Sequence, residues 1–189
     1  MRLKLIALLA AVAVGAFAAP AGAGASTGLT EKGVLLPIGS TITGGNVGSI
    51  TTTSELLGDT VCEMMMFNLE LNQNSAATGF TALGTPTGSM SGCVWNSMAV
   101  KATNVIVVSL SSPSSSSGAG KASFSYEIDY PKLTCKYTAS GVTFTYTAGT
   151  DVITFSDAPL AVSPEGCGPT TFDGAITLST PSGPPIEIM

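Results

Sequence analysis

Four carboxylates in the last third of the chain are the residues whose types and spacing come nearest to catalytic chemistry: Asp151, Asp157, Glu165 and Asp173. Two carboxyl groups about 5–10 Å apart can hydrolyse a glycosidic bond, one as acid and the other as base or nucleophile. Carboxylate oxygens also bind Ca2+, although no Asp-x-Asp-x-Asp spacing supports a calcium site here. All four lie in or beside expected turns, so we interpret them as solvated turn residues, with a polysaccharide hydrolase or a Ca2+ site as alternatives.

The sequence excludes most other catalytic arrangements. It contains no histidine, which removes Ser-His-Asp and Cys-His nucleophile systems as well as the commonest metal ligand. The segment 88–92 is close to a nucleophile elbow, but Met90 stands where serine is required. Phosphate-binding loops and dinucleotide fingerprints are absent. We therefore predict no catalytic residue, no metal ligand and no cofactor, and a protein that is not an enzyme.

Three consecutive methionines, Met64 to Met66, have two interpretations. Thioether clusters can hold Cu(I), and Met90 and Met98 could lie nearby. Filling gaps in a hydrophobic core is the ordinary use of methionine, and we favour it here. Trp95, two residues after Cys93, is expected to pack over a disulfide rather than to anchor a ligand.

The four cysteines, Cys62, Cys93, Cys135 and Cys167, are an even number with successive spacings of 31, 42 and 32 residues. Zinc sites usually pair their cysteines at much closer spacing, so we expect two disulfides formed in an oxidising compartment. Four cysteines allow three pairings, and the sequence alone does not select one. The similar spacing within the first and second pairs favours Cys62–Cys93 and Cys135–Cys167.

The N-terminal segment is typical of a secretory signal peptide. Arg2 and Lys4 precede an apolar run from residue 5 to 18, and small residues follow as a cleavage site. Cleavage after Ala25 would leave 164 of the 189 residues, with five lysines against twelve acidic residues and hence a net charge of −7. Such a surface repels phosphate backbones, so we expect no nucleic-acid partner. No later hydrophobic run is long enough to span a membrane.

The expected elements are strands, because the chain is rich in Val, Ile, Thr, Phe and Tyr and shows no long helical periodicity. Apolar residues alternate with polar ones at 67–71, at 124–130 and at 142–155, where 147–150 supplies a turn. The segment 105–108 is apolar on both faces, as in a central strand. Residues 26–60 are expected to form short edge strands, and the tail from Pro181 to Met189 irregular structure.

The two cysteine pairs divide the chain into similar parts. We predict a signal peptide at 1–25 and a single all-β domain at 26–189, made of two disulfide-linked units at about 55–110 and 121–179. A Ser/Gly/Pro-rich loop at 111–120 joins them. The interpretation is a duplicated strand-turn-strand module, and chance similarity of Thr- and Gly-rich strands is the alternative.

Several motifs after residue 133 resemble those of a family. They are Cys-x-Tyr at 135–137, Ile-x-Phe-Ser at 153–156, Gly-Cys at 166–167 and Phe-x-Gly-x-Ile-x-Leu at 172–178. With the preceding Thr-rich strands, they resemble exported Thr/Ser/Gly-rich, cysteine-paired all-β proteins of high-GC Gram-positive (actinobacterial) bacteria. The resemblance covers roughly residues 34–178. It implies export and an all-β fold, and it brings no catalytic residues.

The sequence thus predicts an all-β protein, an antiparallel β-sandwich of about ten short strands with two disulfides, or alternatively a distorted β-barrel. We expect a secreted or cell-envelope protein that acts as a non-enzymatic structural or binding module. Cell-wall glycan or another extracellular protein is the expected partner. The carboxylate hydrolase and a protein binding Ca2+ or Cu(I) are the alternatives.

Overall fold

The computed structural model describes residues 28–75, 77–84, 88–112, 118–181 and 185–189. It contains twelve β-strands and one short 3-10 turn, η1, at Glu165–Cys167. The strands are β1 Leu29–Glu31, β2 Val34–Leu35, β3 Thr41–Ser54, β4 Gly58–Ser75, β5 Gly79–Gly84, β6 Ser89–Trp95, β7 Met98–Ser112, β8 Ala119–Tyr130, β9 Leu133–Tyr146, β10 Val152–Ser163, β11 Thr170–Ser179 and β12 Glu187–Ile188.

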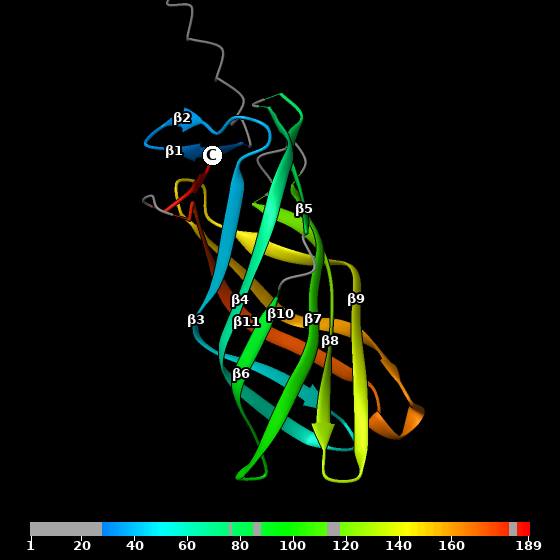
Figure 1. Cartoon of the computed structure of the whole chain (residues 1–189). Coiled ribbons are helices and arrows are strands. Elements are labelled where there is room, and N and C mark those ends of the chain that lie inside the picture. Colours follow the sequence, from blue (N-terminus) through cyan, green and yellow to red (C-terminus); the bar gives the residue numbers. More distant parts are fainter. Residues whose placement is uncertain (1–27, 76, 85–87, 113–117, 182–184) are drawn as a thin grey trace, which may run out of the picture.

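Strands β3 to β11 form one antiparallel sheet that closes on itself. Most neighbours in the sheet are neighbours in sequence, and β11 pairs with β3 to complete the ring (Figure 1). β5 and β6 run in the same direction and share one position between β4 and β7, which makes an eight-position up-and-down barrel. The all-β fold is confirmed, and of the two predicted architectures the barrel is the one present. Its strands are longer than predicted, with 18 residues in β4.

Alternating side chains fill the barrel. The predicted inward residues of β8 are buried, among them Phe124 and Tyr126, while their polar neighbours face out. Two glycines make room for rings on the adjacent strand: a Cβ at Gly44 would lie 2.1 Å from the ring of Phe67, and one at Gly120 equally close to that of Phe144. The core is therefore dense and aromatic.

Three predictions about exposure and strand position were wrong. Val105 and Val107 face the core, but Ile106 and Val108 are exposed, because no second layer of the described chain covers the outer face of β7. The segment 41–54 is no edge strand, since β3 pairs with both β4 and β11. In the tail, Glu187–Ile188 is not irregular, because β12 pairs with β1 and buries Ile188.

The two ends of the barrel are built from different parts of the chain. At one end, which we call the terminal end, β1, β2 and β12 form a three-stranded sheet that brings both ends of the described chain together (Figure 1). At the opposite end, the disulfide end, lie the turns that join β6 to β7 and β8 to β9. This end contains η1 and the nearby cysteines.

The structure forms both disulfides, in the pairing that the spacing favours. Cys62 and Cys93 are register partners in neighbouring strands β4 and β6. Cys135 in β9 is bonded to Cys167 in η1, with 5.9 Å between their Cα atoms. The two bridges thus differ in their surroundings, and the interpretation of the two units as a duplication stays a prediction.

Some predicted segments fall on residues that the structure does not describe. The signal peptide at 1–25 lies outside the described residues, as does the centre of the predicted loop at 111–120, where β7 ends at Ser112 and β8 begins at Ala119. Within the described ranges, no helix has the length and apolar character needed to cross a bilayer.

Candidate functional site

The interior of the barrel is not a binding chamber. A hollow among the core side chains has a volume of about 10 Å³ and is lined by apolar side chains such as Phe124, Phe155 and Phe172. That volume is barely enough for one water molecule, and the apolar lining offers water no hydrogen-bond partner. This hollow is therefore too small for any ligand larger than a water molecule.

Near the disulfide end, the buried hydroxyl groups of several tyrosines and threonines form hydrogen bonds with one another. The Tyr126 hydroxyl lies 2.6 Å from Thr52 Oγ1. The Tyr130 hydroxyl lies 2.9 Å from Thr60 Oγ1 and 3.0 Å from the Tyr137 hydroxyl. Burial raises the pKa of both Tyr126 and Tyr137 above the ordinary tyrosine value, since the charged phenolate would be desolvated. Within the described chain no buried side-chain nitrogen or oxygen lacks a partner. The cluster is structural.

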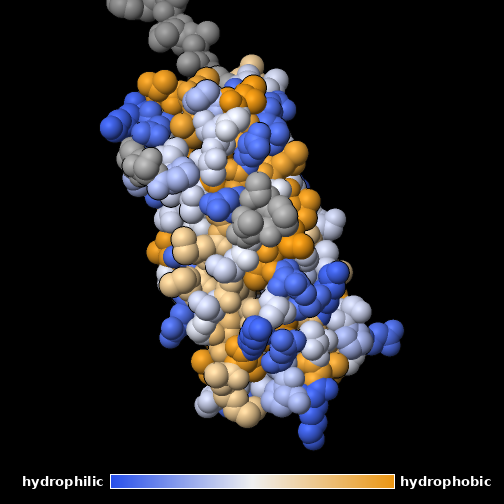
Figure 2. All heavy atoms as spheres, viewed as in Figure 1, coloured by the Kyte–Doolittle hydropathy of each residue, from blue (hydrophilic) through white to orange (hydrophobic). Residues whose placement is uncertain are grey.

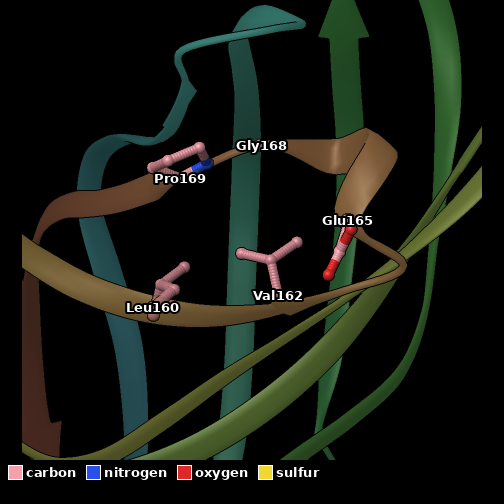
Figure 3. A pocket seen from close by; sticks show the side chains of 5 residues that line it. All are labelled: Leu160, Val162, Glu165, Gly168 and Pro169. Atoms are coloured by element: carbon pink, nitrogen blue, oxygen red, sulfur yellow. The ribbon is translucent and has the colours of Figure 1, made fainter.

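The four predicted carboxylates do not meet in one site. Asp151 precedes β10 and Glu165 follows it, and a strand of 12 residues at about 3.3 Å per residue separates them by roughly 40 Å. Glu165 projects from η1 into a shallow pocket of about 310 Å³, with Leu160 and Val162 of β10 on the other side (Figure 3). No second carboxylate lines that pocket, so it lacks the pair that glycoside hydrolysis requires.

Asp157 and Asp173 are the two that the fold brings together. The backbone N–H of Asp157 in β10 donates to Asp173 Oδ1 in the adjacent β11, at 2.8 Å. Asp157 has a φ of 47°, in the left-handed region that few residues other than glycine adopt. The carboxylate of Asp173 thus holds Asp157 in a bulge, where the pairing between β10 and β11 shifts register.

The bulge at Asp157 faces a second one across an opening in the barrel wall. β9 and β10, both described throughout, pair at Tyr146–Ile153 and Thr145–Thr154 and again from Thr138–Ala161 onwards, and their residues between these positions are not paired with each other. Each strand has two consecutive exposed residues in this stretch, Ser140–Gly141 and Ser156–Asp157. The two strands therefore separate over about six residues and close again at the same register.

This opening forms a pocket of about 320 Å³ whose lining includes hydroxyl and charged side chains. Its lining residues are Lys121, Ser140, Gly141, Val142, Thr143, Ser156, Asp157, Ala158 and Pro159. Lys121 Nζ donates to Thr143 Oγ1 at 2.7 Å, so a positive charge lies at one side of the opening and the Asp157 carboxylate at the other. Backbone groups that border a break in a sheet are available to a ligand, as they are at a sheet edge.

A second hollow continues along the same two strands towards the terminal end. It measures about 400 Å³ and is lined by Thr145, Tyr146, Thr147, Thr150, Asp151, Val152 and Thr154. The outward residues of β9 run from one hollow into the other, with Thr143 in the first and Thr145 in the second. We call the two together the β9–β10 groove. From Pro159 to Asp151 it extends roughly 25 Å along β10.

The predicted methionine cluster is divided between two faces. Two consecutive exposed residues, Glu63 and Met64, break the alternation of β4 and leave Met65 inside, opposite the buried Met90, whereas Met64 and Met66 are 51% and 46% exposed. The prediction that Met64 and Met66 fill the core was therefore wrong. Among the described residues, no three Asp, Glu, Cys or His side chains gather in a way that could hold a metal ion.

Sequence reasoning found Asp151 and Asp157 but missed the groove around them. The missed residues include Lys121, Ser140 and Thr143. A signal was present: Gly141 lies in the middle of one strand and Pro159 in the middle of the next, and both residues mark bulges or missing ladder bonds. Alternation alone does not show that the two irregularities face each other.

Comparison with known proteins adds no identity. No protein-family model, no curated protein and no solved structure matches this chain.

Proposed function

We propose that this is a secreted or cell-envelope binding module without enzymatic activity, whose β9–β10 groove binds a chain of neutral sugars such as a cell-wall polysaccharide. The observation that carries the proposal is the interrupted pairing between β9 and β10, which opens a hydroxyl-lined groove in an otherwise closed sheet. The two disulfides are consistent with an oxidising compartment outside the cytoplasm.

The chemistry of the groove fits a sugar chain. Hydroxyl groups of Ser140, Thr143 and Thr145 follow one another along β9 and can each donate and accept. Lys121 adds donors and the carboxylates of Asp157 and Asp151 add acceptors, one in each hollow. A ligand with many hydroxyl groups in a row could form hydrogen bonds with this series of residues. A strongly charged ligand would instead meet both positive and negative charges in the groove.

Asp173 does not enter the groove, which argues against the carboxylate hydrolase. Its oxygen accepts the Asp157 N–H from β11, so it positions Asp157 and leaves a single carboxylate in the opening. Two-carboxylate hydrolysis requires both groups to flank the scissile bond. Binding without cleavage is the function that this arrangement supports best.

Titration of the purified protein with solubilised cell-wall polysaccharide, followed by calorimetry, tests the proposal. The variant Thr143→Val/Asp157→Asn removes two partners while keeping a β-branched residue in β9 and a residue that tolerates positive φ in β10. We expect at least about tenfold weaker binding, since each neutral or charged hydrogen bond contributes about 1–2 kcal/mol. The matched control, Thr41→Val, changes an exposed threonine of β3 outside the groove and should bind like wild type.

Two outcomes would overturn the proposal. One is equal binding, or none, by all three proteins. The other is release of new reducing ends by the wild type that Asp157→Asn abolishes, which would establish the hydrolase instead.

A further inference from the structure

A group of exposed apolar side chains lies on the outside of the barrel, away from the groove. It covers β4 to β7, and we call it the Met/Val face. Its members are Val61, Met64, Met66, Leu83, Val94, Met98, Ile106 and Val108, all between 37% and 53% exposed. A light-orange strip over β4 and β6 marks its lower part in Figure 2.

Strand register relates the members of this face on β4, β6 and the start of β7. Val61 of β4 is the partner of Val94 in β6, which in turn pairs with the exposed Ala99 of β7. Met64 and Met66 continue along β4 opposite Ser91 and Ser89. No layer of the described chain covers these residues. The terminal sheet, by contrast, buries its own apolar residues Leu29 and Ile188.

The size of this face matches half of a protein interface. From their exposed fractions, the eight side chains present roughly 600 Å² of surface, at the upper limit of the largest apolar patch on a typical monomer. Two such faces in contact would bury at least about 1,200 Å², where specific interfaces begin. Flexible, polarisable methionine side chains are also common at binding surfaces.

Two charges within the face are self-complementary. Glu63 on β4 and Lys101 on β7 flank Gly92 of β6 at the same level of the sheet, since Cys62 pairs with Cys93 and Cys93 with Val100. The Glu63 carboxylate lies over Gly92, where a Cβ would be 2.9 Å from its Oε2. A two-fold axis along β6 in the contact plane would set Glu63 of each copy against Lys101 of the other. Such a contact is isologous and uses each charge once.

We propose that the Met/Val face docks a second copy of this chain, forming a symmetric back-to-back dimer. In the ring of eight positions, the face is centred on β6 and the groove lies between β9 and β10, nearly half a turn away. The dimer would therefore point its two grooves in opposite directions. If the grooves bind glycan as proposed above, the dimer is a bivalent cross-linker that gains avidity on a polymeric ligand.

Sedimentation velocity across a concentration series up to about 200 µM tests the dimer without any ligand, since interfaces of this size are often transient. We expect a monomer–dimer equilibrium that Val94→Glu weakens at least tenfold. Thr143→Glu, which places the same charge on the opposite wall, should leave the equilibrium unchanged. Both residues are exposed, and thermal unfolding of each variant checks that the fold is intact.

A charge exchange tests the axis. Glu63→Lys and Lys101→Glu should each weaken association, because like charges then meet across the contact, and the double variant should restore it. A wild type that stays monomeric throughout, or a dimer that Val94→Glu leaves intact, would overturn the proposal. A double variant no better than the single ones would overturn the two-fold arrangement. None of these results depends on glycan binding.

Discussion

The disulfide end and the terminal end of the barrel are held in place by different interactions. At the disulfide end, Cys135–Cys167 ties η1 to β9, and Ser54 Oγ donates to the Cys167 carbonyl at 2.5 Å. At the terminal end, the amide side chain of Asn74 links separate segments by hydrogen bonds instead of a covalent bond. Asn74 accepts from Leu29 N–H at 2.9 Å and donates to the carbonyls of Leu29 and Leu36 at 2.8 and 2.9 Å.

The two ends therefore contribute to the free energy of unfolding in different ways. The covalent end constrains the unfolded chain, whereas the terminal end relies on contacts that exist only in the folded state. The disulfide end should therefore resist local opening, and the terminal end should open first. The predictions below begin with the largest effect.

Loss of the second disulfide should be the most damaging change. Replacing Cys135 and Cys167 together by alanine frees a loop of 32 residues, which costs about 3–4 kcal/mol of unfolding free energy on the chain-entropy model. Urea unfolding measures the loss. The matched pair is Cys62 and Cys93, whose separation of 31 residues predicts a similar global loss.

Hydrogen exchange distinguishes the two bridges. Amides around η1 should lose protection only in the Cys135/Cys167 variant, because the ladder between β4 and β6 still aligns residues 62 and 93 in the other. Equal protection at η1 in both variants would contradict the role assigned to Cys135–Cys167.

Alkaline pH should destabilise the protein through the buried tyrosines near the disulfide end. Tyr126 and Tyr137 have raised pKa values in the folded state, so above about pH 10 the unfolded chain loses protons that the folded chain keeps. Their stabilising contribution is complete below the unfolded pKa and is lost as the pH rises beyond it. The slope should reach about 2.7 kcal/mol per pH unit for the two groups together.

Urea unfolding at several pH values between 8 and 11.5 measures this slope, and Tyr126→Phe/Tyr137→Phe is the control because phenylalanine does not titrate. A slope that the double variant retains would assign the alkaline loss to other groups.

Removal of the Asn74 side chain should open the terminal end by itself. Asn74→Ala deletes three hydrogen bonds and should cost about 2–3 kcal/mol. Hydrogen exchange should show lost protection at the amides of Leu29 and Leu36 and unchanged protection around η1. Asn72→Ala, on the same strand but with one exposed bond to Leu83 N–H, should have little effect. Loss of protection at both ends would contradict the independence of the two closures.

Much of this fold could be predicted from local pattern. The alternation from Phe124 to Tyr130 identifies β8 and its buried face, and the turn at 147–150 forms with Thr150 N–H donating to the Thr147 carbonyl. Closure into a ring could not be predicted in this way. It depends on the pairing of β3 with β11, more than a hundred residues apart, which no local signal encodes.

Exposure was harder to predict, because it depends on what covers each face. Val105–Val108 has the composition of a strand buried on both sides, yet nothing within the described chain covers Ile106 or Val108. A break in the alternation of β4, where Glu63 and Met64 are both exposed, reversed the expected orientation of Met64 and Met66. At the site, Asp157 was a candidate from its type alone, but the groove comes from two bulges facing each other, and this is a property of register rather than of composition.

The most direct test of the account is the location of glycan binding on the protein. A titration of isotopically labelled protein with soluble cell-wall oligosaccharide, followed by amide chemical shifts, measures it. We expect the largest shifts at residues 139–145 of β9 and 154–160 of β10, with those of β4 and β6 unchanged at a concentration where the protein is monomeric. Shifts centred on the Met/Val face or on the pocket at Glu165, or no shifts at any concentration, would contradict the assignment of the β9–β10 groove as the binding site.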